Sequence, residues 1–187
     1  MRKLSFLLVL VLMGATMNAQ STWKSDNAHS KVGFSITHLM ISEVEGSFGE
    51  FAITATADDT FGDASFEVDI KVASIDTDNG NRDNHLKSPD FFDAEKYPSI
   101  TFESTSYEKT GDKTFKVTGD LTMHGVTKTV TLDGKVNGVI TDQRSQKLKA
   151  GLKLTGTVNR LEFGVGGDTP TLGDDVEFTV NLEMAQQ

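Results

Sequence analysis

Few residues in this sequence have the types and spacing that catalysis or metal binding requires. The four histidines, His29, His38, His85 and His124, are scattered, and neither a Cys nor a dense carboxylate cluster accompanies them. Zinc sites use ligands at short, fixed spacings, so no metal and no cofactor is predicted. The sequence has no nucleophile-elbow or phosphate-loop motif, and its Gly-rich segment 164–173 does not join a strand to a helix. These patterns favour a binding protein over an enzyme.

Three basic side chains are candidates for contact with a polar head group. Arg82, His85 and Arg160 could meet a phosphate or a carbonyl, because a guanidinium recognises phosphate with two parallel hydrogen bonds. The alternative is a local role, in which Arg82 pairs with Asp83 or Asp90 or closes a hinge in its own segment. Both interpretations depend on the elements that position these residues.

Alternation of apolar and polar residues dominates the chain, as expected for half-buried antiparallel strands. Three segments alternate clearly: 64–74, 146–158 and 175–184. Five shorter or less regular segments are 31–37, 50–57, 99–107, 115–123 and 126–136. No amphipathic helical pattern lies between them. The sequence therefore predicts an all-β protein of about eight strands, which excludes a doubly wound α/β fold.

Glycines inside or beside the strands favour a barrel over a sandwich. Gly119, Gly134, Gly151 and Gly156 weaken strands locally, and such positions usually mark a bulge, a barrel corner or a close approach of another group. A strongly curved, closed sheet accounts for them better than two stacked sheets. We therefore predict an eight-stranded antiparallel β-barrel.

A short helical plug is predicted around residues 82–96. Ser88-Pro89 is typical of a helix start, with a capping hydroxyl followed by Pro in the first turn. Tyr97-Pro98 returns the chain to an extended conformation. With Leu86 and the Phe91-Phe92 pair on its buried side, this segment would close one end of the barrel.

The inward faces of the strands and of the plug supply candidates for the lining of a ligand cavity. These apolar candidates are Phe34, Ile36, Phe51, Ile53, Phe66, Val68, Ile70, Phe91, Phe92, Phe102, Phe115, Val117, Leu152 and Leu154. An eight-stranded barrel is just wide enough for core side chains or one slender ligand. The alternative is that the same residues fill a solid core.

The N-terminus predicts export. Arg2 and Lys3 precede an apolar run that is too short for a membrane span, so residues 1–19 resemble a secretory signal peptide and residues 20–187 form a single domain. Without Arg2 and Lys3, 16 basic residues face 27 acidic ones, a formal charge of −11. Nucleic acid and anionic membranes are therefore unsuitable partners. No later segment is apolar enough to span a membrane.

A run of motifs resembles the YceI-like family of periplasmic polyisoprenoid-binding proteins. The motifs stand in the family's order: His29-Ser30, Gly46 with Phe48, Arg82-Asp83 with His85-Leu86-Lys87-Ser88, Phe91-Phe92-Asp93, Tyr97-Pro98, Gly119-Asp120-Leu121-Thr122, His124-Gly125-Val126-Thr127, and Arg160 with Phe163-Gly164. The resemblance implies an extended lipocalin-like barrel that holds a long-chain isoprenoid, such as a polyprenyl phosphate or isoprenoid quinone. It also implies a periplasmic, non-enzymatic carrier or storage protein, with homodimerisation as an expectation.

Two functions from different classes follow from these observations. The first is an exported lipid-binding protein with an amphiphile in the barrel interior, for transport or storage. The second is a stress-protective structural or interaction protein whose barrel is filled by its own side chains and holds no ligand. Lipid that co-purifies with the folded protein would distinguish the two, because only the first binds one.

Overall fold

The computed structural model describes residues 20–187, and the predicted signal peptide, residues 1–19, lies outside these described residues. Its strands are β1 Ser21–Ser25, β2 Lys31–His38, β3 Ser42–Phe48, β4 Phe51–Ala57, β5 Ala64–Lys71, β6 Ile75–Asp76, β7 Ser99–Lys109, β8 Thr114–Met123, β9 Val126–Thr141, β10 Leu148–Asn159 and β11 Leu172–Gln186. The helix α1 spans Gly80–Lys87, and short 3₁₀ turns span Val72–Ser74 and Arg160–Phe163.

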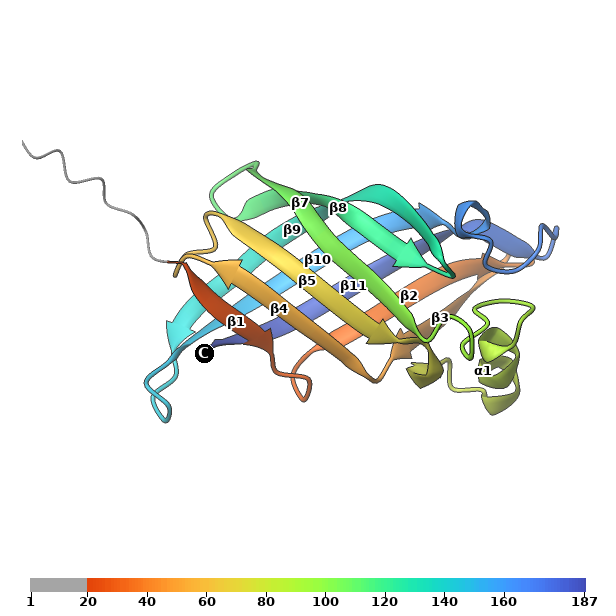
Figure 1. The fold of residues 1–187 in the computed structure, drawn as a ribbon, viewed down its shortest axis with the longest axis horizontal. Coiled ribbons are helices and arrows are strands. Elements are labelled where there is room, and N and C mark those ends of the chain that lie inside the picture. Colours follow the sequence, from red (N-terminus) through yellow and green to blue (C-terminus); the bar gives the residue numbers. More distant parts are fainter. Residues whose placement is uncertain (1–19) are drawn as a thin grey trace, which may run out of the picture.

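The strands form an elongated, closed antiparallel barrel (Figure 1). Eight strands make the ring in the order β1-β4-β5-β7-β8-β9-β10-β11, and β11 closes it by pairing with β1. The predicted all-β, extended lipocalin-like, eight-stranded barrel with a short helical segment is thus confirmed. Closure leaves the ring itself without the exposed sheet edges that would otherwise invite strand pairing with other chains.

The barrel wall is extended at one end by three further strands. β11 pairs with β1 through Met184–Gln186 but with β2 through Leu172–Asn181, so the two strands share one partner. β2 continues into the hairpin with β3, and β3 pairs with the short β6. This end of the wall therefore contains strands that the other end lacks, and it is the end at which α1 lies (Figure 1).

Three strands were absent from the sequence prediction: β1, β3 and the two-residue β6. β1 has one fully buried apolar residue, Trp23, and β3, with the sequence SEVEGSF, offers only Val44 and Phe48. Neither segment alternates over enough residues to show period two. β2 is accordingly a strand of the extended wall, whereas the ring itself begins with β1.

Glycine in the strands permits aromatic rings to lie against the backbone. A Cβ at Gly46 would overlap the ring of Phe34 on the neighbouring β2, and one at Gly134 would overlap the ring of Phe115 on β8. The close-approach explanation for strand glycines is therefore correct at these positions. A register shift at Gly151 in β10 supplies a bulge as well.

One end of the barrel is solid. Trp23 and Phe61 are at most 2% exposed, and their ring centroids lie 4.9 Å apart. Phe115 stacks on Tyr107 at 4.7 Å, and Met184 is fully buried beside them in the same core. We call this cluster of Trp23, Phe61, Tyr107, Phe115 and Met184 the filled end. Its aromatic rings occupy the space between the strands.

The plug differs from its prediction in where the helix lies. Helix α1 begins after Asn79, whose side chain accepts a hydrogen bond from the backbone N–H of Arg82 at 3.1 Å, and it ends at Ser88. Ser88 was predicted to start a helix, and that prediction is wrong. Because Pro89 disfavours helical geometry at the preceding residue, Ser88 is extended and its N–H donates back to His85 O. Turns continue the plug, fastened by Phe92 N–H to Leu86 O at 3.0 Å.

Candidate functional site

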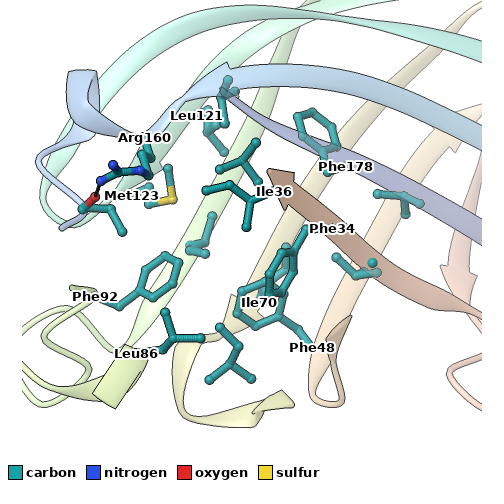
Figure 2. A pocket seen from close by; sticks show the side chains of 18 of the residues that line it. Phe34, Ile36, Phe48, Ile70, Leu86, Phe92, Leu121, Met123, Arg160 and Phe178 are labelled. Atoms are coloured by element: carbon teal, nitrogen blue, oxygen red, sulfur yellow. Dashed lines mark hydrogen bonds between the residues drawn. The ribbon is translucent and has the colours of Figure 1, made fainter. Parts of the chain in front are cut away.

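An apolar cavity of about 460 Å³ occupies the barrel interior at the end near α1. Its wall comes from the inward faces of the strands β2 to β5 and β7 to β11 and from the plug. Figure 2 shows Phe34, Ile36 and Phe178 among the side chains that line it. Pockets for small organic ligands usually have volumes of roughly 300–1,000 Å³. This cavity has the volume and the lining expected for a hydrophobic ligand.

Ten of the fourteen apolar candidates from the sequence line this cavity. They are Phe34, Ile36, Ile53, Phe66, Val68, Ile70, Phe91, Phe92, Phe102 and Leu154. Phe51, Phe115, Val117 and Leu152 are buried in the core but do not belong to the cavity lining. Phe115 packs in the filled end, so both interpretations of these side chains apply, each at its own end of the barrel.

Several lining residues were not among the candidates although the sequence pattern contained them. Leu121 and Met123 lie on the inward face of β8, Val130 on β9 and Phe178 on β11. All four occupy apolar positions of the alternating strands, so period two was the signal that could have found them. Phe48 comes from β3, a strand that shows no such period.

The plug supplies one wall of the cavity. The ring of Phe92 meets the ring of Phe48 edge-on, with centroids 6.3 Å apart, and Leu86 projects from α1 beside Phe92 (Figure 2). Phe48 in turn packs on Phe34 at 5.7 Å. A continuous aromatic contact thus joins the plug to the hairpin β2–β3 across the cavity.

Arg82 lines the cavity from α1 and is held by Thr77. Its Nε donates to Thr77 Oγ1 at 2.7 Å and its Nη2 to Thr77 O at 2.6 Å, while the Thr77 hydroxyl donates to Asp83. Arg82 therefore forms no direct ion pair with Asp83 or Asp90, because Thr77 links it to Asp83 and Asp90 lies beside His85. The other suggested local role, closing a hinge in its own segment, agrees with the two bonds to Thr77. Among residues 20–187, Nη1 of Arg82 has no hydrogen-bond acceptor, so it can still donate to a ligand.

His85 lies one turn after Arg82 on α1 and also lines the cavity. Its Nε2 is 3.3 Å from Asp90 Oδ2, and its ring meets Phe91 edge-on at 5.0 Å. His38, at the end of β2, contributes a second imidazole to the lining. Arg82, His85 and His38 therefore belong to the small polar part of a mostly apolar wall, which also includes Arg160, Thr169 and Thr171.

Arg160 has a different role from that of Arg82, although both line the cavity. It is 3% exposed, and its five N–H groups all have acceptors within the protein. Nε donates to Gly173 O at 2.8 Å, Nη1 to the carbonyls of Val165 and Gly167 at 3.0 Å, and Nη2 reaches Leu172 O and Asp174 at 3.5 Å. Arg160 therefore holds the loop before β11 in place and keeps no donor for a head group.

Comparison with known proteins agrees with this geometry. The model of the YceI-like domain matches residues 23–184. The chain belongs to the YceI-like family. A UPF0312 protein of Pseudomonas putida is 38% identical over 179 residues, which cover 95% of this chain and 92% of the relative. The YceI protein of Campylobacter jejuni is 39% identical, with a TM-score of 0.75 over 87% of this chain and 96% of that one.

A more distant solved structure shares the fold alone. A polyisoprenoid-binding domain from Saccharophagus degradans, implicated in plant cell wall breakdown, is 11% identical, with a TM-score of 0.66 over 88% of this chain and 98% of that one. The barrel architecture is therefore kept although most side chains differ.

One polar cluster on this YceI-like chain has metal-ligating side chains. Asp26, His29 and Glu183 place their ligand atoms within 4.8 Å of one another at the surface. The hydrogen bond from His29 lowers the pKa of Asp26, and the Lys149 ammonium lies 2.7 Å from Glu183 and 4.0 Å from Asp26. A cation would have to compete with Lys149. Sequence reasoning missed the cluster because Glu183 is distant along the chain.

No helix within residues 20–187 is long and apolar enough to cross a membrane.

Proposed function

We propose that this YceI-like protein binds a long-chain isoprenoid or a similar amphiphile in its barrel cavity, for transport or storage, without catalysing a reaction. The observation that carries the proposal is the apolar cavity of about 460 Å³ between the barrel wall and the plug. The polyisoprenoid-binding domain with the same fold supports this ligand class.

The length of the ligand follows from the energetics of apolar burial. Burying about 10 chain carbons at ~0.8 kcal/mol each contributes about 8 kcal/mol. Association costs an estimated ~4–15 kcal/mol. Short chains therefore bind weakly, and only a chain that fills the cavity gains a clear surplus.

The polar end of the ligand lies near α1 in this proposal. Arg82 offers Nη1, and His85 lies one turn further along the helix, so a phosphate or a quinone carbonyl could accept hydrogen bonds there. Charge-assisted hydrogen bonds to phosphate are stronger than neutral ones. A polyprenyl phosphate or an isoprenoid quinone therefore matches both parts of the site. Arg160 is not included, because its donors are occupied.

Export to the periplasm and homodimerisation complete the proposal. The basic start and the apolar run of residues 1–19 support export, and the acidic composition suits an exported carrier. Homodimerisation follows from the family resemblance only.

The alternative is a stress-protective protein with a filled barrel and no ligand. The filled end has the packing that this alternative requires, whereas the cavity near α1 does not. The cavity therefore favours the lipid-binding function.

The test is native mass spectrometry of the protein expressed with its N-terminal segment, followed by organic extraction of bound lipid. We expect one isoprenoid or fatty amphiphile per chain. The natural chain is compared with the variant Leu121→Trp, which places a larger side chain in the cavity. This variant should still fold but should retain severalfold less lipid. An unliganded mass, together with no thermal shift on adding such lipids, would support the filled-barrel alternative.

A further inference from the structure

The tip of the hairpin between β2 and β3 exposes three consecutive large apolar side chains. Leu39 is 49% exposed, Met40 77% and Ile41 86%. Single exposed apolar residues are common on proteins, but contiguous ones mark interaction sites. We call residues 39–41 the apolar tip.

The backbone of the apolar tip is strained. Leu39 and Met40 have φ values of +52° and +59°, and the N–H of Ile41 donates to His38 O at 3.2 Å, which closes a two-residue turn. Such turns favour Asn-Gly, because both central residues take left-handed conformations. Bulky side chains at these positions cost stability, and strain of this kind is often retained for function.

The apolar tip lies next to the cavity mouth, the place where the exposed Thr171 lines the cavity. The N–H of Leu39 donates to Thr171 O at 2.8 Å, and His38, Val44 and Thr171 all belong to the cavity lining. In Figure 1 the β2–β3 hairpin and α1 lie at the same end of the barrel. Whatever covers the tip therefore also faces the opening to the cavity.

The size and charge of the apolar tip restrict the kind of surface that can bind to it. Three side chains on a narrow turn are too few for a stable protein interface, which needs ~800 Å² from each partner. They suit insertion between lipid head groups. Glu43 follows the tip directly on β3, and the acidic chain repels anionic lipids. A bilayer without net charge is therefore the favoured surface.

We propose that the apolar tip Leu39–Ile41 inserts into the surface of an electrically neutral bilayer and sets the cavity mouth against it. This inference rests on the proposed function, because an amphiphilic ligand resides in a bilayer and must leave it to enter the barrel. Docking places the mouth where that transfer is shortest.

The test is flotation of the purified protein with phosphatidylcholine vesicles, for the natural chain and two variants. Leu39→Asn/Met40→Gly/Ile41→Ser supplies the residues that the turn favours, so the variant should fold at least as stably while its vesicle association falls at least tenfold. The control, Ile140→Ser, removes an exposed apolar side chain near the far end of β9 and should associate like the natural chain. Anionic vesicles at low salt should bind less of the natural chain.

Three outcomes would overturn the inference. Equal vesicle association of all three proteins would exclude the tip as the docking element, and so would no association of the natural chain. Dimerisation that depends on the tip, without vesicle binding, would assign the tip to self-association. Lipid bound to each protein, measured in parallel by mass spectrometry, separates this inference from the proposed function. A lipid-loaded protein that ignores vesicles refutes docking alone, whereas an empty protein that binds vesicles refutes the lipid-binding function alone.

Discussion

The two ends of this barrel share strands and differ in what lies between them. At the filled end, Trp23 packs on Phe61 and Phe115 packs on Tyr107, and Trp23, Phe61 and Phe115 are at most 2% exposed. At the end near α1, Leu121 and Val130 are only partly buried because they face a cavity of about 460 Å³. The same ring of strands thus provides a core at one end and a binding site at the other.

Two physical differences separate the ends. The first is side-chain size, because large aromatic rings fill the space at the filled end. The second is the wall itself, since near α1 the strands β2 and β3 take the places that β1 and β4 hold at the filled end, and the plug adds a further wall there. Stability and binding are therefore expected to depend on different residues.

The largest expected effect is the loss of a filled-end side chain. Trp23→Ala should lower the free energy of unfolding by about 3–5 kcal/mol, because it leaves a void in a close-packed core. Leu121→Ala, in the cavity wall, should cost clearly less, because that side chain already lacks neighbours on one side. Urea unfolding of both variants measures the difference. Equal losses would contradict the distinction between the ends.

Replacing the two arginines that line the cavity should change the free energy of unfolding by clearly different amounts. Arg160→Met should lower the free energy of unfolding by about 3 kcal/mol, because it leaves one buried and two partly buried carbonyls without donors. Arg82→Met should cost about 1 kcal/mol or less but weaken the binding of a polyprenyl phosphate relative to the matching alcohol. Chemical unfolding and ligand titration check both variants. A stable Arg160→Met protein with impaired binding would reverse the assigned roles.

A smaller effect is expected at the strand glycines of the hairpin. Gly46→Ala should push the Phe34 ring toward the cavity and weaken lipid binding about tenfold, a difference of about 1.4 kcal/mol. Gly33→Ala is the matched control, because its Cβ would meet no heavy atom closer than 3.6 Å. Titration with one isoprenoid compares the two. Unchanged binding of Gly46→Ala would show that Phe34 does not limit the occupied space.

The smallest predicted effect concerns the filled end at alkaline pH. Burial, with the nearby charges of Asp58 and Asp63, raises the pKa of Tyr107 to about 12, and its hydroxyl donates to Phe61 O at 2.5 Å. Because the folded pKa lies above that of the unfolded chain, this contribution to stability is complete below pH 10 and is lost as the pH rises toward 12. Thermal unfolding from pH 8 to pH 11.5 should show a slope that Tyr107→Phe reduces. An identical slope in the variant would exclude Tyr107 as its source.

The sequence predicted the barrel because its long strands alternate without interruption, as β5 and β10 do. It missed β1 and β3, in which too few apolar residues mark the inward face. It also misplaced the helix, since Ser88-Pro89 has the residues of a helix start but here ends α1. Local sequence patterns therefore predict strands well. They predict helix boundaries poorly when a Ser-Pro pair can stand either at the start of a helix or just after its end.

The candidate site was predictable in its chemistry more than in its geometry. Period two places Phe34 and Leu154 on inward faces, but it cannot tell a cavity wall from a filled core, which also contains Phe115. Arg160 shows the same limit. Its residue type suits phosphate, yet the carbonyls around it come from a loop whose path only the fold determines.

The most direct test of the account is the dissociation constant for a series of isoprenoids that share one head group and increase in chain length. If the cavity near α1 binds the isoprenoid chain, affinity should rise severalfold or more with each added isoprene unit, because each unit buries further apolar carbon. The affinity should level off once the cavity is full. An affinity that does not change with chain length would contradict a chain-binding cavity.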